Sequence, residues 1–470
     1  MKVLKKLFDM EKGFYRKVLV FALPIALQSL ITNGVNILDS IMVSRLSTEK
    51  TELAAVNCAN LYINIYHILC MGLGMGASVL VSRYWGMRET QGEKAMTAVK
   101  KSICIMIRLT LGLAALFALA TALWPNQIIQ IFLKEGQGLD VVSCGTVYLN
   151  YSVVTFFFLG MSLTCTIVLR SVGQVKMPLY VSIGAFFVNL VANYSLIFGH
   201  FGCPKLGIAG AALGTLIARI YETSVICGYL FFVDKKVLFR LKHLLMKTSD
   251  LLGEYIRISI PVLVSDGILA LGNTAVGIVI GHCGGTYLAA NTAASNTQML
   301  SSVMIQGVCQ SGAIVTGQTL GEGDKEKAQR QGYGFLGFGL GLGLISALII
   351  LLTKNWVLAL FDLEGEIAAI AGQFMNAITL IVVFQGTNSI MTKGVLRGGG
   401  DTKVLMVADN IFLWILAIPL GILASHLGFS PFWLFMCLKA DQITKAIWCV
   451  LRLRSGKWIK KIKISTHAQE

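Results

Sequence analysis

Residues 18–44 read VLVFALPIALQSLITNGVNILDSIMVS, and this stretch decides the fold. About 20 apolar residues in a helix cross the hydrocarbon core of a bilayer, and this run is longer than that. Lipid offers no partners for backbone polar groups, so a spanning segment of this kind must be helical. The stretch therefore predicts a transmembrane helix, with Pro24 and Asp39 inside it.

The composition extends this prediction to the whole chain. Of 470 residues, 55% are hydrophobic and 14% are charged, and the mean hydropathy is +0.71. Soluble domains carry about 25% charged residues, so the composition excludes a soluble enzyme. The formal net charge of +16 could indicate a protein that binds nucleic acid. That interpretation fails if the basic residues lie in alternate loops beside apolar helices, because this is how membranes orient proteins.

Apolar stretches of spanning length recur along the chain, and we predict an all-α membrane protein with twelve transmembrane helices. The predicted spans are 18–44, 54–82, 102–124, 141–168, 178–199, 207–233, 256–281, 289–320, 333–353, 368–392, 404–426 and 430–451. The N-terminus, the C-terminal tail and the loops on their side hold 31 Lys and Arg residues, against five on the other side. This asymmetry predicts that both termini are cytoplasmic, and it makes nucleic acid an unnecessary partner.

The two halves of the chain repeat each other at an offset of about 235 residues. Pro24 aligns with Pro261 and Gly86 with Gly321. Six helices per half leave both halves in the same orientation, so they form two pseudo-symmetric lobes around a central cavity. The predicted parts are an N-terminal lobe at 1–233, a basic linker at 234–254, a C-terminal lobe at 255–454 and a basic cytoplasmic tail at 455–470.

Two such lobes predict a transporter that works by alternating access. The chain contains no G-x-x-x-x-G-K-[ST] motif, so an ion gradient rather than a nucleotide must supply the energy. Na⁺ or H⁺ is then the coupling ion, and we expect no cofactor.

Polar side chains mark one face of the first predicted span. Gln28, Thr32, Asn36 and Asp39 follow each other at steps of four, four and three. A carboxylate inside a span costs about 2.5–3.5 kcal/mol, so Asp39 is expected to face a wet cavity, where it can bind a proton or a cation. The alternative is that Asp39 lies near the outer end of the helix and is simply solvated.

The fifth and sixth spans add neutral oxygen and amide groups. Asn189 and Asn193 share a helical face, and Thr215 follows the small-residue run GIAGAALG. These residues suit a cation site that Asp39 completes, or a hydrogen-bond network around Asp39. A third interpretation is that the amides only hold helices together.

The second half carries a different set of polar residues in its spans. Acidic and aromatic groups in an apolar cavity suit organic cations, although each residue is as well explained by structural pairing. The candidates are Asp266, Gln306, Asp409 and Trp414. Arg219 with Glu222 and Asp441 with Lys445 have partners one turn away, and we predict that both pairs are structural ion pairs.

At this point the chain resembles the multidrug and toxic compound extrusion (MATE) transporters along essentially its whole length. The segments that carry the resemblance are LPIALQSLITNGVNILDSIMVSRLS (23–47), ELAAVN (52–57), LRSVGQVKMP (169–178), NLVANYSLIFG (189–199), PKLGIAGAALGT (204–215), LRGGGDTK (396–403) and LRLRSGKW (451–458). The resemblance implies twelve helices in two lobes. It also implies export of lipophilic, often cationic compounds in exchange for Na⁺ or H⁺.

The resemblance also implies roles for individual residues. Asp39 matches the family's first-helix aspartate and Pro24 its first-helix proline, while Asn189 and Thr215 match the proposed coupling site of the first lobe. Asn193 stands where many relatives have a second acid. The implied coupling group is therefore Asp39, Asn36, Asn189, Asn193 and Thr215, and for sodium the ligands would be Asp39, Asn189, Asn193 and Thr215. Pro24 is the implied conformational residue, and the implied substrate cavity contains Gln28, Thr32, Asp266, Gln306, Asp409 and Trp414.

Other functions fit the sequence less well. A flippase for a lipid-linked or polysaccharide precursor uses the same superfamily fold and is the main alternative. An intramembrane hydrolase would need a nucleophile and base, or a motif such as H-E-x-x-H, and the sequence has neither. We expect a monomeric, multi-pass protein of the bacterial inner membrane that meets small organic molecules and the lipid bilayer.

Overall fold

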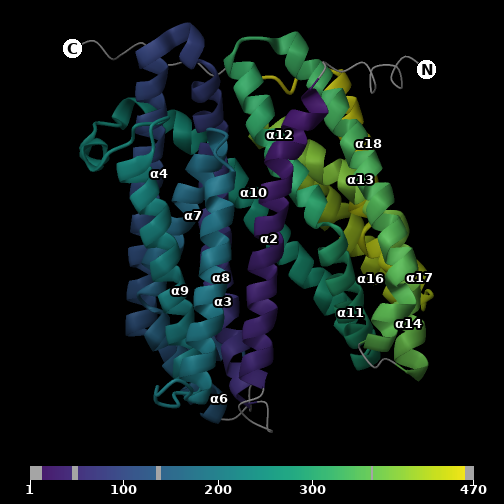
Figure 1. The fold of residues 1–470 in the computed structure, drawn as a ribbon. Helices are drawn as coiled ribbons and strands as arrows, with labels where there is room; N and C mark the ends of the chain where they lie inside the picture. Colours follow the sequence, from purple (N-terminus) through teal and green to yellow (C-terminus); the bar gives the residue numbers. More distant parts are fainter. Residues whose placement is uncertain (1–12, 45–50, 134–138, 361–363, 461–470) are drawn as a thin grey trace. The chain divides into compact units, whose positions relative to one another are not determined.

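The computed structural model describes residues 13–44, 51–133, 139–360 and 364–460, and within these ranges it is helical throughout, with no strand. The helices of the first half are α2 (Phe14–Ser44), α3 (Thr51–Gly86), α4 (Arg88–Leu123), α5 (Pro125–Ile131), α6 (Leu139–Ser152), α7 (Thr155–Ser171), α8 (Lys176–Phe198), α9 (Ile208–Gly228), the π-helix η1 (Tyr229–Val233) and the 3₁₀-helix η2 (Leu241–Leu245). Figure 1 shows their arrangement.

The second half contains α10 (Ser249–His282), α11 (Gly285–Ser301), α12 (Val303–Gly321), α13 (Lys325–Leu360), α14 (Gly365–Ser389), η3 (Ile390–Leu396), α15 (Thr402–Asn410), η4 (Ile411–Ala417), α16 (Ile418–His426), α17 (Pro431–Leu438) and α18 (Ala440–Arg454). Both η3 and η4 are π-helical. Such segments widen a helix locally and often occur at functional sites. Each one follows directly on an α-helix, so it changes the direction of side chains without ending the span.

The prediction of an all-α membrane protein is confirmed, and all twelve predicted spans are helical. Over the described ranges, nine helices are long and apolar enough to cross a membrane, and two pairs bent by 55° and 50° raise this number to eleven. The bent pairs are α6 with α7 and α11 with α12, at the predicted spans 141–168 and 289–320. The twelfth span, 430–451, is divided at Lys439 into α17 and α18. Asp441 and Lys445 interrupt its apolar run.

The chain divides into two compact units. Among the described residues, unit 1 takes in 13–27, 82–95 and 260–460, and unit 2 takes in 28–81 and 96–259. Helices α2, α3, α4 and α10 each contribute to both units. The predicted boundaries of the lobes, at 233 and 255, stay a prediction.

Each unit has its own apolar core. In unit 1 the core includes the fully buried rings of Phe374, Phe435 and Trp458. In unit 2 one core cluster is built around Tyr66, whose hydroxyl donates a hydrogen bond of 2.7 Å to the carbonyl of Phe156. Nε1 of Trp458 likewise donates to Oε1 of Gln329 at 2.8 Å, so the polar atoms of these two rings are paired inside the cores.

Small residues let two helices of unit 2 approach closely. Helices α8 and α9 lie side by side (Figure 1), and a Cβ atom at Gly210 or Gly214 of α9 would collide with the backbone of Leu196 or the side chain of Asn193 on α8. Gly210 and Gly214 therefore allow close packing of α9 against α8. This contact also places α9 directly beside the amides of α8.

Candidate functional site

Asp39 of α2 lies in a polar cluster with two amides of α8. The Nδ2 atom of Asn193 donates a hydrogen bond of 2.6 Å to Oδ1 of Asp39, and the side chain of Asn189 lies close to the same carboxylate. Asn193 Nδ2 lies 3.3 Å from Oδ1 of Asn189. Both asparagines are almost fully buried. Asp39, Asn189 and Asn193 therefore meet, as the sequence pattern predicted.

One acceptor atom in this cluster has no partner among the described side chains. Oδ1 of Asn193 is buried and accepts no hydrogen bond from any of them. It lies against Gly214 of α9, where any larger residue would displace it. A buried oxygen without a donor is costly unless a ligand satisfies it, so the cluster fits a bound proton donor or a small cation. Oxygen donors of this kind are what hard cations prefer.

The side of the cluster formed by α6 and α9 is also polar. The hydroxyl of Tyr148, on α6, lies near the side chain of Thr215 and donates a long hydrogen bond of 3.4 Å to Oδ1 of Asn60. Tyr148 is buried and close enough to Asp39 for the two groups to interact electrostatically. Thr215 is thus linked to the surroundings of Asp39 through Tyr148, a residue that the sequence analysis did not consider.

A positive charge lies near Asp39. Arg219 of α9 interacts electrostatically with Asp39, and its Nη1 atom also pairs with Oε2 of Glu222 at 2.6 Å. The predicted Arg219–Glu222 ion pair is confirmed. Glu222 already holds the guanidinium. Among the described residues, Asp39 therefore has a cation nearby but no direct salt bridge to it.

Gln28 and Thr32 make internal contacts in unit 2. Gln28 donates from Nε2 to Oγ of Ser182 at 2.8 Å and accepts at Oε1 from Nη2 of Arg170 at 2.5 Å. The hydroxyl of Thr32 donates to the carbonyl of Gln28, one turn back in the same helix. Gln28 therefore joins α2 to α7 and α8, and its hydrogen bonds within the described part of the chain do not include the Asp39 cluster.

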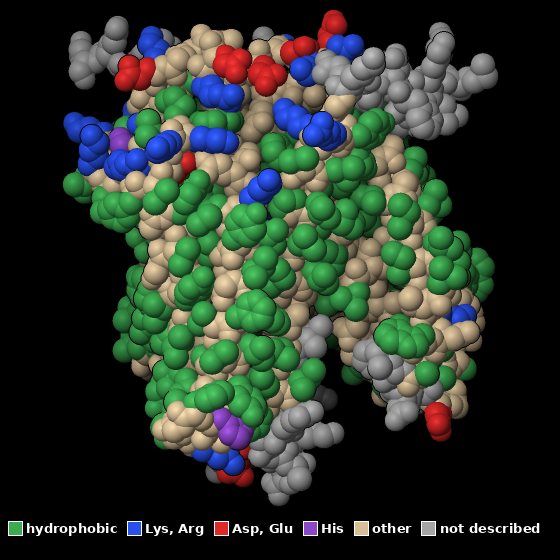
Figure 2. Space-filling model, in the orientation of Figure 1, with side chains coloured by type: hydrophobic (Ala, Val, Ile, Leu, Met, Phe, Trp, Pro, Cys, Tyr) green, Lys and Arg blue, Asp and Glu red, His purple; other side chains and the backbone are tan. Residues whose placement is uncertain are grey.

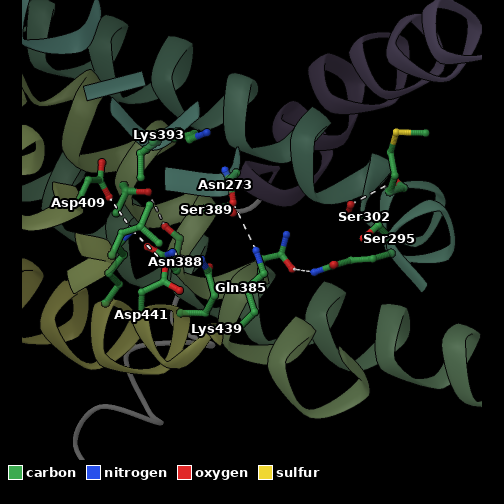
Figure 3. Close-up of a pocket in the computed structure, with 17 residues that line it drawn as sticks. Asn273, Ser295, Ser302, Gln385, Asn388, Ser389, Lys393, Asp409, Lys439 and Asp441 are labelled. Atoms are coloured by element: carbon green, nitrogen blue, oxygen red, sulfur yellow. Dashed lines mark hydrogen bonds and ion pairs between the residues drawn. The ribbon is translucent and has the colours of Figure 1, made fainter. Parts of the chain in front are cut away.

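Unit 1 contains a polar pocket of about 310 Å³. Figure 3 shows amide, hydroxyl, carboxylate and ammonium groups converging on it from several helices. It is lined by Leu269, Asn273, Ser295, Gln298, Met299, Ser302, Gln385, Asn388, Ser389, Thr392, Lys393, Asp409, Leu413, Lys439, Asp441, Gln442 and Lys445. Ligand pockets are usually mostly apolar, so this lining is unusually polar.

Three carboxylates within the spans of unit 1 form ion pairs with arginine or lysine side chains. Asp266 accepts two hydrogen bonds from Arg397, at 2.8 Å and 3.2 Å. In the pocket, Lys445 lies 3.3 Å from Oδ1 of Asp409 and 3.2 Å from Oδ2 of Asp441. The predicted Asp441–Lys445 pair is confirmed, but Lys445 also binds the acid that the sequence analysis placed in the substrate cavity.

The remaining predicted residues are dispersed. Asp409 lines the pocket, whereas Asp266, Gln306 and Trp414 are not among its lining residues. Gln306 is exposed on α12, and Trp414 donates a long hydrogen bond of 3.4 Å to the carbonyl of Ile268. Pro24 lies inside α2 in unit 1. The side chain of Asn36 lies outside the described residues.

Some members of these sites were missed from the sequence. Lys393 and Lys439 line the pocket, and Lys439 lies 3.3 Å from Oδ1 of Asn273. Lys439 and Lys445 gave a usable signal, because each lies inside a predicted span, where a lysine is rare. Lys393 gave none, because it was counted as a loop residue at the end of the tenth span.

Comparison with protein families finds the same repeat that the sequence suggested. A model of the MatE family matches residues 24–195 and again residues 261–423. The two matched segments begin at Pro24 and Pro261 and together cover more than half of the chain. One family pattern therefore fits both halves.

Individual relatives are distant but match over most of their length. The chain is 24% identical over 428 residues to the uncharacterized transporter YisQ of Bacillus subtilis, covering 90% of both chains. It is also 24% identical over 416 residues to the probable multidrug resistance protein NorM of Thermotoga maritima, covering 87% of this chain and 86% of that one.

A solved structure shares the fold. It is the outward-facing conformation of a multidrug resistance MATE family transporter of the MOP superfamily, with a TM-score of 0.84 and 18% identity, covering 97% of this chain and 99% of that one.

Proposed function

Because the chain belongs to the MatE family of membrane transporters and is not an enzyme, we propose that it exports lipophilic or cationic organic compounds in exchange for Na⁺ or H⁺. The relative named as a probable multidrug resistance protein supports drug export over the flippase alternative. We propose further that it acts as a monomer in the bacterial inner membrane, with both termini in the cytoplasm, and by alternating access.

The observation that carries the proposal is the partly buried Asp39–Asn193 hydrogen bond of 2.6 Å. Asp39 is bound by neutral amides, so its negative charge is available to a coupling ion. A proton on the carboxylate would weaken its hydrogen bond from Asn193, and a sodium ion would instead recruit the unpartnered Oδ1 of the same amide. Either event changes the contact between α2 and α8 within unit 2.

The coupling energy is sufficient for export. One charge that crosses 100 mV releases about 2.3 kcal/mol, which supports a roughly 50-fold concentration ratio of an exchanged compound. A single carboxylate binds a single monovalent ion, so one coupling ion per cycle suits this site. Pro24 removes one backbone hydrogen bond from α2, and we propose that this lets α2 change shape when Asp39 binds its ion.

The polar pocket of unit 1 is the proposed place where substrate polar groups bind. Asp409 is the predicted cavity residue that lines it, and it is already paired with Lys445. A cationic substrate at Asp409 would therefore have to compete with this lysine, which would weaken cation binding there. We propose that amide and hydroxyl groups of the lining contribute more to binding than the acids do.

The test is ethidium efflux from vesicles or whole cells under separately imposed sodium and proton gradients. We expect Asp39→Asn to reduce gradient-driven efflux at least 100-fold, because the isosteric amide cannot bind the ion. The matched control is Asp140→Asn, an exposed acid at the start of α6, which should leave efflux unchanged. Normal efflux in the Asp39 variant would reject the coupling site, and absent efflux of the parent under both gradients would reject drug antiport.

A further inference from the structure

The basic stretch between α9 and α10 is an ordered segment of unit 2. Asp234 begins it: its carboxylate is buried and accepts hydrogen bonds from the backbone N–H groups of Lys236, Val237 and Leu238. Nε2 of Gln174 also donates to Oδ1 of Asp234 at 2.6 Å. The turn after η1 is therefore fixed by side-chain hydrogen bonds, as expected for a defined structural element.

Arg108 of α4 holds the next part of this segment. Its Nη2 atom donates to the carbonyls of Leu244 and Met246, at 2.6 Å and 3.1 Å, and Nε donates to Leu244 at 3.2 Å. Sγ of Cys104, one turn earlier on α4, donates to the same carbonyl of Leu244 at 3.3 Å. Figure 1 shows the teal segment after α9 lying beside α4.

These contacts place the segment at the depth of the predicted span of α4. Lys101, which pairs with Asp250 at 2.7 Å, ends the basic part of α4, and Arg108 lies seven residues further, about 10 Å along the helix. Backbone carbonyls at membrane depth need partners, and Arg108 supplies them to the end of η2. This contact also accounts for an arginine inside a span, which is otherwise costly.

Large apolar side chains of the segment point outward. The exposed fraction is 87% for Leu245, 52% for Leu241 and 48% for Leu238. Lys242 and Lys247 are exposed among them. Figure 2 shows Lys and Arg side chains gathered at this end of the molecule, directly above a hydrophobic surface. Leucines beside lysines at the edge of a span are the pattern of a segment that lies in a membrane interface.

We propose that residues 238–247 form an interfacial anchor, in which Leu241 and Leu245 enter the acyl region while Lys242 and Lys247 bind the phosphates of anionic phospholipids. The positive charge of the segment is complementary to the negative charge of such headgroups. The contact with Arg108 places the leucines of the segment beside the predicted span of α4. The anchor would tie the connection between the two halves of the chain to the membrane surface. It does not depend on the transported substrate or the coupling ion.

The first test measures depth in vesicles of phosphatidylglycerol and phosphatidylcholine. A fluorescent non-natural amino acid is placed at position 245, or at the exposed control position 93 of α4, and it is quenched by acyl-brominated lipid or by aqueous iodide. We expect brominated lipid to quench position 245 at least threefold more than position 93. Quenching of position 245 mainly by iodide would show that it faces water, and quenching by neither agent would show that protein covers it. Either result would overturn the proposal.

The second test measures lipid selectivity by the thermal stability of detergent-purified protein titrated with phosphatidylglycerol. The double variant Lys242→Gln with Lys247→Gln should need roughly 30-fold more of this lipid to reach half of the maximal stabilisation. Each lysine near the membrane surface contributes about fivefold to the lipid affinity. The control variant, Lys403→Gln with Lys457→Gln, removes two exposed lysines elsewhere and should behave as the parent. Equal titration curves for the two double variants would contradict headgroup binding.

Discussion

Asp39 in unit 2 is held differently from Asp266 and Asp409 in unit 1. Asp39 receives a hydrogen bond from the neutral amide of Asn193, which lies beside the amide of Asn189. Asp266 is instead bound by both terminal nitrogens of Arg397, and Asp409 shares Lys445 with Asp441. A carboxylate that neutral donors stabilise keeps its charge available, whereas a carboxylate with a fixed cation has its charge already compensated.

This difference shows how a repeated sequence can divide its functions. Both halves match the same family pattern, yet the polar residues inside them are not equivalent. The first half places one acid among amides and hydroxyls, which suits reversible ion binding. In the second half, an ion pair joins Asp266 of α10 to Arg397, directly after η3, and another joins Asp409 of α15 to Lys445 of α18. Such pairs suit a structural role around a polar pocket.

The largest expected effect comes from breaking the ion pair at Asp266. Arg397→Ala leaves the largely buried Asp266 without its hydrogen-bonded cation and with only Lys393 nearby, and breaking a buried pair costs about 3–5 kcal/mol. We expect a strong loss of thermal stability, measured by unfolding of the purified protein. The double variant Asp266→Asn with Arg397→Gln should recover most of it. An Arg397→Ala variant as stable as the parent would show that Asp266 is not compensated in this way.

The next prediction concerns Lys445, which serves two acids. Lys445→Met should destabilise the protein by about 3 kcal/mol, because Asp409 and Asp441 then repel each other without a cation. Adding Asp409→Asn should restore roughly half of the loss, whereas adding Asp39→Asn, in unit 2, should restore nothing. Thermal unfolding of the three variants measures the coupling. Equal rescue by both second substitutions would contradict the proposed difference between the units.

Sequence patterns predicted the features that depend on hydrophobicity and on contacts between residues close together in the chain. The spans, the repeat and the pairs Arg219–Glu222 and Asp441–Lys445 follow from periodicity and from spacings of three or four residues. The shared face of Asn189 and Asn193 was predicted in the same way, and the structure places it against Asp39.

The remaining contacts depend on residues that are distant in sequence. Asp266 and Arg397 are 131 positions apart, and Gln28 and Arg170 are 142 apart, so no local pattern links them. The same reason explains why the acids of the second half were expected to face organic cations: their own cations lie on other helices. Arg108 was counted inside a span without a role, because its partners lie 136 and 138 residues further on.

A smaller effect is expected at Asn193, and it also distinguishes the two coupling ions. Asn193→Leu removes a charge-assisted hydrogen bond, worth about 1.5–3 kcal/mol. If sodium is the ion, its half-saturating concentration in efflux should rise at least tenfold, because an oxygen ligand is lost. If protons couple transport, half-maximal efflux should move to higher pH, because the ionised carboxylate has lost a donor. If neither shift is observed, Asn193 does not contribute to the ion site.

The smallest predicted effect tests the packing that holds the Asp39 cluster together. Gly214→Ala places a Cβ atom against the side chain of Asn193, so α9 must move away from α8 or Asn193 must change its conformation. We expect a loss of about 1–2 kcal/mol in stability and a several-fold reduction in coupled efflux. Gly228→Ala is the matched control on the same helix, because a Cβ atom there meets nothing within 4 Å. Alanine is also the better helix former, so this control should be neutral or slightly stabilising. Similar behaviour of the two variants would show that the close approach of α9 does not position Asn193, and the cluster of unit 2 would then depend on α2 and α8 alone.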